Sequence, residues 1–216
     1  MDRCQDQILL CKTARDAAIH RKWKLVKSLL VKCSKGTGGT FFSDILKSAI
    51  GNGESECVQL VLEKTDPTSA YSGSRTILFD AVTSSEDREG MLRLCVRSGV
   101  STLQRSLETG HYSPMKRALQ NGQLPLVRLL HESGSSSNHE LFLLKNDASI
   151  RTQLERQRRQ DIVQYVDQAA SNPASLQHLC RLIISHLAGC RPGRRDRVAS
   201  LPVPWCVQEF LSFADF

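Results

Sequence analysis

The chain has 216 residues, of which 40% are hydrophobic and 24% charged, and its formal net charge is +7. This composition provides enough apolar surface for one or two folded domains and excludes an intrinsically disordered chain. The first residues, MDRCQDQILLCKTARD, mix acidic and basic charges with a short apolar stretch, and no apolar run is long enough for a membrane helix. We therefore expect neither a signal peptide nor a membrane span, and a location inside the cell, in the cytoplasm or the nucleus.

Eight cysteines are spread along the chain at wide and irregular spacings, and none forms a Cys-x-x-Cys pair. Zinc sites and disulfide frameworks both have characteristic cysteine spacings that are missing here. We therefore expect reduced and mostly buried thiols. Cys180 is a separate case, because it lies on an apolar stripe near the C-terminus.

A helix-turn-helix unit recurs along the chain. Its clearest copy, SPMKRALQNGQLPLVRLLHESG at residues 113–134, has a Ser-Pro turn, a short helix, an Asn-Gly break and a second helix that ends at Gly134. Equivalent apolar residues of the second helix recur in steps of 32, 34, 35 and 36 residues, at Val26, Val58, Leu92, Val127 and Val163. A near-constant period of this length is typical of stacked repeat proteins.

The period and the layout of the unit resemble ankyrin repeats, in which a turn and two antiparallel helices stack into a solenoid. The copy at residues 113–134 matches the family pattern closely, whereas the first two copies lack the Thr-Pro turn and the fifth, ending in DIVQYV (161–166), has no recognisable turn. The resemblance implies an all-α fold in which residues 1–170 form an ankyrin-repeat solenoid of about four to five repeats, the last degenerate.

Motifs of catalysis and of ligand binding are weak or missing. SKGTGGT at residues 34–40 lacks the Gly-Lys-Ser/Thr ending of a phosphate-binding loop, because Lys35 precedes the glycines. The six histidines do not pair with carboxylates or cysteines at metal-ligand offsets, and no Gly-x-Ser-x-Gly elbow is present. We therefore expect no catalytic residues, no cofactor and no metal.

Basic residues concentrate in residues 20–32, 156–159 and 191–197. Such clusters could meet phosphates, acidic proteins or an anionic membrane surface, or they could be solvated outer faces of repeat helices and a solvated loop. Aromatic residues make up only 6% of the chain and do not alternate with the basic ones, which argues against nucleic-acid binding.

The segment SLQHLCRLII at residues 175–184 begins a C-terminal part that breaks the repeat period. Its apolar residues form one stripe on a helix that we predict over residues 172–188, with Asn172 and Pro173 at its start and Gly189 and Pro192 at its end. A basic loop follows, and LPVPWCVQEFLSF (201–213) predicts a rigid extended turn and a short helix. The stripe either covers the end of the solenoid or docks another protein.

Residues 171–216 resemble the SOCS box of the ankyrin repeat and SOCS box family. The elongin C-binding motif of that family is a small residue, Leu, three residues, Cys, three residues and an aliphatic residue, and it is matched by Ser175, Leu176, Cys180 and Ile184. The resemblance implies elongin C binding by the stripe residues Ser175, Leu176, Leu179, Cys180, Ile183 and Ile184. The family's cullin motif, Leu-Pro-apolar-Pro, is matched by Leu201, Pro202, Val203 and Pro204.

The resemblance implies a non-catalytic substrate receptor of a ubiquitin ligase. Elongin C and elongin B, cullin-5 with its RING partner and a protein substrate would be its partners, and the bound substrate would be ubiquitinated and degraded by the proteasome. The concave surface of a solenoid nominates eight substrate contacts: Phe41, Phe42, Tyr71, Arg75, Phe79, His111, Tyr112 and Lys116. Two alternatives stay open, a ligase-independent ankyrin scaffold or inhibitor and a basic nucleic-acid-binding repeat protein.

Overall fold

A computed structural model describes residues 2–34, 39–65, 76–100, 113–172, 175–188 and 194–213. Within these ranges every regular element is a helix, and the helices are joined by turns and short bends. The prediction of an all-α fold is therefore confirmed.

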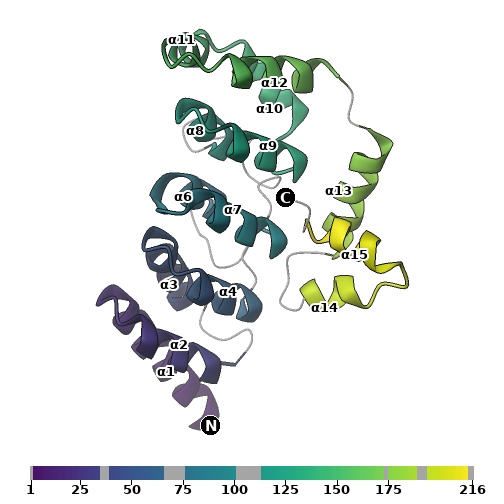
Figure 1. Cartoon of the computed structure of the whole chain (residues 1–216). Helices are drawn as coiled ribbons and strands as arrows, with labels where there is room; N and C mark the ends of the chain where they lie inside the picture. The colour runs from purple at the N-terminus through teal and green to yellow at the C-terminus, as the bar shows by residue number, and fades with distance from the viewer. Residues whose placement is uncertain are drawn as a thin grey trace.

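Antiparallel helix pairs stack one on another through most of the chain (Figure 1). The pairs are α1 (Asp2–Ile19) with α2 (Trp23–Lys32), α3 (Gly39–Gly51) with α4 (Ser55–Lys64), α6 (Ile77–Ser84) with α7 (Arg88–Arg97), α8 (Pro114–Gln120) with α9 (Leu124–Glu132), and α11 (Ala148–Arg156) with α12 (Gln160–Ser171). The first helices of the pairs contact one another in one row and the second helices in another. We call this stack the array. A further helix, α10 (Asn138–Lys145), precedes the last pair and packs against α12.

The turn inside most pairs depends on one residue in the left-handed region of backbone space. Gly53 (φ 72°) and Gly122 (φ 64°) take this conformation at no steric cost, since glycine has no Cβ. Arg21 (φ 55°) and Arg158 (φ 56°) occupy the equivalent places in the first and last pairs. The last pair therefore forms this turn in the same way as three of the other four pairs, although its residue types do not predict it.

Each pair buries the apolar residues that define the repeat. Val26, Val58, Leu92 and Val127 have no exposed surface, so the sequence period corresponds to one continuous core. Val163 is only partly buried, and its neighbour Ile162 is the fully buried residue of α12. The fifth copy thus joins the core less completely than the other four.

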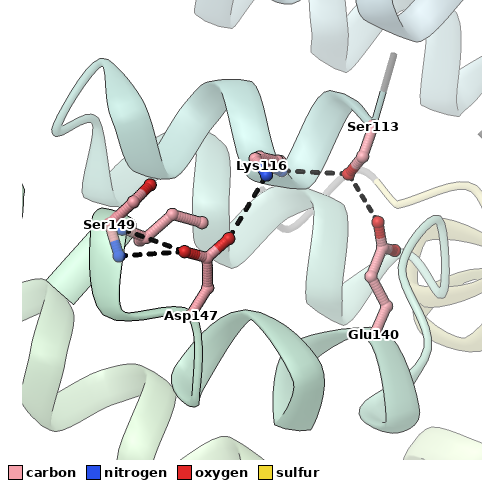
Figure 2. A network of polar contacts seen from close by, with 6 residues as sticks. Ser113, Lys116, Glu140, Asp147 and Ser149 are labelled. Atoms are coloured by element: carbon pink, nitrogen blue, oxygen red, sulfur yellow. Dashed lines mark hydrogen bonds and ion pairs between the residues drawn. The ribbon is translucent and has the colours of Figure 1, made fainter. Parts of the chain in front are cut away.

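Polar contacts tie α8 to the two helices that follow α9 (Figure 2). The Ser113 hydroxyl accepts a hydrogen bond from the backbone N–H of Lys116 (3.0 Å) and donates one to Glu140. The Lys116 ammonium lies 3.2 Å from Asp147, whose carboxylate also accepts from the backbone N–H of Ser149. Burial alone would raise the pKa of Asp147, but these hydrogen bonds lower it below its usual range. Capping side chains therefore hold the irregular end of the array together.

Three short helices complete the chain: α13 (Leu176–Ala188), α14 (Arg194–Ala199) and α15 (Trp205–Leu211). They fold back beside the second helices of the array instead of extending the stack (Figure 1). No described helix is long and apolar enough to cross a membrane.

Candidate protein-binding site on the C-terminal helices

Helix α13 begins at Leu176, four residues later than predicted. Ser175 is the residue that starts it, since its hydroxyl accepts a hydrogen bond from the backbone N–H of His178 (3.2 Å). Asn172 ends the preceding helix α12 instead, with its N–H bonded to the carbonyl of Gln168 (3.0 Å). Pro173, Gly189 and Pro192 lie outside the described residues.

The apolar stripe of α13 faces outward. Leu176 and Leu187 are 77% and 78% exposed, and four residues between them are also exposed, though less so: Leu179, Cys180, Ile183 and Ile184. A helix that covered the end of the array would bury this stripe, so the exposure contradicts that alternative. The stripe is a solvent-facing apolar surface about three helical turns long.

An arginine occupies the opposite, inward face of α13. Arg181 is only 3% exposed, and its guanidinium lies 4.2 Å from the ring centroid of Phe210 and 4.1 Å from that of Phe213. A cation close to aromatic faces is attracted by the ring quadrupole, and this attraction is stronger where water is excluded. Arg181 therefore attaches α13 to α15 and fixes the side of α13 that stays exposed.

Two further arginines join the ends of the short helices. Arg197 donates to the backbone carbonyl of Ala188 (2.9 Å), and Arg194 donates to that of Leu211 (3.5 Å). Basic side chains bind the last carbonyls of a helix favourably, because those carbonyls lack a partner within the helix and carry its negative dipole end. The prediction of a basic loop after the stripe is wrong for residues 194–199, because they form helix α14.

The segment Leu201–Pro204 forms the extended turn that the two prolines predict. The side-chain amide of Gln208 donates to the carbonyls of Leu201 (3.1 Å) and Val203 (3.2 Å), which holds the turn against α15. Pro202 and Pro204 are exposed, and Pro204 precedes the first residue of α15. The neighbouring Trp205 is 70% exposed, which its residue type does not predict.

The family model described as SOCS box matches residues 172–212, the segment that carries the exposed stripe of α13 and the turn at residues 201–204. This segment is a SOCS box. SOCS boxes link proteins to elongin B/C and to cullin ubiquitin ligase complexes, and the proteins that carry them are typically adaptor subunits. The comparison does not identify ankyrin repeats in the chain. No curated protein and no solved structure gives a match.

Among the described residues, two of the places where the SOCS box contacts the array are well defined. At one, Arg97 of α7 donates to the carbonyl of Phe213 (3.3 Å). At the other, the side chain of Leu182 lies so close to Gly134 that an added Cβ would come within 2.5 Å of it. Nearby, the ring of His178 lies 6.1 Å from that of His131 in α9. These contacts give the stripe a defined position relative to the array.

The structure changes the list of predicted substrate contacts. Phe42 has no exposed surface and belongs to the core, so the prediction for this residue is wrong. Phe41 and Phe79 are half-buried, and Lys116 forms the ion pair with Asp147 described above. Tyr71, Arg75, His111 and Tyr112 lie outside the described residues. The position of a residue within a repeat does not show which aromatic side chains turn inward, and this explains the error at Phe42.

The described cysteines fall into two groups. Cys11, Cys33, Cys57 and Cys95 are buried thiols, Cys180 and Cys206 are exposed thiols, and none of these six forms a disulfide. Burial raises the pKa of Cys57 to about 11, and burial together with the hydrogen-bonded thiol of Cys11 raises that of Cys33 to about 12. Among the described residues, no group of three or more histidine, cysteine or acidic side chains could hold a metal ion.

Proposed function

We propose that this protein is a substrate-recognition adaptor of an elongin B/C, cullin-5 RING ubiquitin ligase. The single observation that carries the proposal is the exposure of the apolar stripe on α13 within a segment that matches the SOCS box. An apolar face of this size is costly to leave in water, so it indicates a protein partner.

The stripe has the residue spacing of a helix face that docks into a groove. Leu176, Cys180 and Ile184 follow one another at intervals of four residues, so their side chains lie on one face of α13. Burying such side chains supplies several kcal/mol at about 25 cal/mol per Å² of apolar surface. Arg181 holds α13 against α15 before any partner binds, which lowers the entropy that docking would lose. Elongin C, with elongin B bound to it, is the partner we propose for this face.

The turn at Leu201–Pro204 is the second proposed contact, and it would select cullin-5 with its RING partner. Its prolines are exposed and its backbone is held by Gln208, so the segment is presented in one conformation. The array would hold the protein substrate, which the ligase would then mark for proteasomal degradation. We assign this activity to the interior of the cell, in the cytoplasm or the nucleus.

Co-expression with elongins B and C tests the proposal. We expect the wild-type chain to form a stoichiometric complex that survives gel filtration, and we expect Leu176→Ala combined with Cys180→Ala to abolish it. Both side chains are exposed, so the double variant should fold normally. Circular dichroism of the purified variant would confirm that its helices are intact.

Phe142→Ala combined with Leu143→Ala is the matched control. These residues are also exposed and apolar but lie on α10 in the array, so the complex should form unchanged. No complex from a folded wild-type chain would refute the adaptor role and favour a ligase-independent scaffold. In a second step, Pro202→Ala with Pro204→Ala should weaken cullin-5 binding to the preformed complex without releasing elongin C.

A further inference from the structure

Large exposed apolar side chains occur at three places in the described residues. One is the SOCS box, and a second is α10, with Phe142 and Leu143. The third is the first helix pair, and it contains five such residues: Ile8, Leu9, Ile19, Leu25 and Val31. No large hydrophobic side chain of α3, α4, α6, α7, α8 or α9 is exposed in this way.

Helix α2 has one buried and one open face. Val26 and Leu30 are completely buried against the rest of the array. Five residues on the opposite side of α2 span about a third of the helix circumference, since each residue turns the helix by about 100°. These are Lys24, Leu25, Ser28, Val31 and Lys32, all of them exposed.

Helix α1 is built in the same way. Cys11, Ala14 and Ala18 are buried, whereas Ile8, Leu9 and Lys12 are exposed. The pair contacts α3 and α4 on one side, and no other described helix lies beyond it at that end of the stack (Figure 1). A terminal repeat that only closes a solenoid needs a polar outer face. The outer face of this pair is mixed, with exposed apolar residues such as Leu25 and Val31 among lysines, and closing a solenoid does not require those apolar residues.

The charges on the open face of α2 have a single sign. Residues 20–32 contain five lysines and arginines and no acidic residue. Of these, Lys27 pairs with Glu54 and Glu56, but no ion pair joins Lys24 or Lys32 to any described acidic side chain. A second copy of the chain, placed symmetrically on this face, would bring like charges together. A partner with acidic and apolar residues would complement it.

We propose that the open face of α2 is a docking site for an acidic amphipathic segment of another protein. Apolar side chains of the segment would cover Leu25 and Val31, and its carboxylates would meet Lys24 and Lys32. The docking itself does not depend on elongin binding. Its use for capturing a ubiquitination substrate rests on the proposed adaptor function.

A fluorescent synthetic helical peptide of about 18 residues, with leucines along one face and glutamates elsewhere, tests this site on the full chain. A second peptide with lysines in place of the glutamates is the charge control. We expect the acidic peptide to bind, and its affinity to fall between about 50 and 300 mM salt because exposed charges are screened. Leu25→Ser with Val31→Ser, and separately Lys24→Glu with Lys32→Glu, should each weaken binding at least about tenfold.

Two control variants replace exposed apolar residues elsewhere, and both should bind the peptide normally: Phe142→Ser with Leu143→Ser, and Leu176→Ser with Ile183→Ser. The second variant lies in the SOCS box, so its result separates this site from the elongin site. The proposal is overturned by absent binding, by equal binding of the lysine peptide, or by loss of binding in either control variant. A dimer in sedimentation velocity that dissociates in the Leu25→Ser, Val31→Ser variant would also overturn it, since the face would then join two copies.

Discussion

At the scale of single residues, the arginines of the SOCS box act as structural side chains. Arg181, Arg194 and Arg197 use their charge on aromatic rings and on helix-end carbonyls within the protein. The basic cluster at 191–197 is therefore explained in part by the packing of three short helices, which are too small to bury a large apolar core. The buried charges of Arg181 and Arg194 are therefore not part of the surface available to a nucleic acid.

Arg181→Ala should destabilise the SOCS box. The substitution removes both contacts with Phe210 and Phe213 and leaves a void beneath α13, and we expect a loss of about 2 kcal/mol in local stability. Hydrogen exchange would show faster exchange of the α15 amides. Gln177→Ala, at an exposed position on the same helix, should leave exchange unchanged. Equal exchange rates in the two variants would mean that Arg181 contributes no attachment of α13 to α15.

At the scale of elements, the position of α13 depends on the end of α9. Gly134, just after α9, has the left-handed conformation (φ 69°), and the side chain of Leu182 from α13 occupies the space that a Cβ on Gly134 would need. A glycine is needed here for two reasons, the backbone angle and the close approach of another helix. Gly53 (φ 72°) has only the first reason, since an added Cβ there would meet nothing within 4 Å.

This difference makes Gly134→Ala and Gly53→Ala a matched pair. Both should lose about 1 kcal/mol, because alanine is disfavoured in the left-handed region. Gly134→Ala should lose about 1 kcal/mol more, since its Cβ would approach Leu182 Cδ2 to 2.5 Å and Cγ to 3.3 Å, and rotating the methyl groups alone does not relieve both contacts. Urea unfolding would give the two losses. Equal values would show that α13 does not press on α9 at this point.

The elements that could be predicted from the sequence are those determined by local pattern. The apolar period places the second helices of all five pairs, and the spacing of Leu176, Cys180 and Ile184 predicts the stripe. Helix α14 could not be predicted in this way, because the carbonyls that its arginines bind belong to Ala188 and Leu211, at the ends of other helices. The inward turn of Phe42 likewise depends on neighbouring pairs and not on its own segment.

At the scale of the whole molecule, the array and the SOCS box meet around a hollow of about 340 Å³. Three rings contribute to its lining, and they come from three helices: His131, Tyr165 and His178. His131 Nδ1 lies 2.9 Å from the Tyr165 hydroxyl, and its Nε2 lies 3.2 Å from Asn138 Oδ1. Because these groups belong to both parts of the chain, the junction should respond to a change in their charge.

Acidification should loosen this junction. Burial, with the neighbouring His131 and the charge of Arg181, lowers the pKa of His178 below its ordinary value of 6.5, and the carboxylate of Glu132 in the same hollow does not reverse the direction. The folded state therefore favours neutral His178. The stability of the folded state is undiminished above about pH 6.5. It falls as the pH drops through the lowered pKa of His178, since the unfolded state binds the proton more tightly.

Hydrogen exchange of α13 at pH 7.5 and at pH 5.5, corrected for the intrinsic exchange rate, would measure this effect. We expect lower protection at the acidic pH in the wild type and a smaller change in His178→Gln, whose side chain stays neutral. The amides of α3 and α4, remote from the hollow, serve as the internal reference. If His178→Gln retained the full pH dependence, another group would control the junction. A confirmed effect would mean that the position of the elongin-binding stripe relative to the array depends on pH.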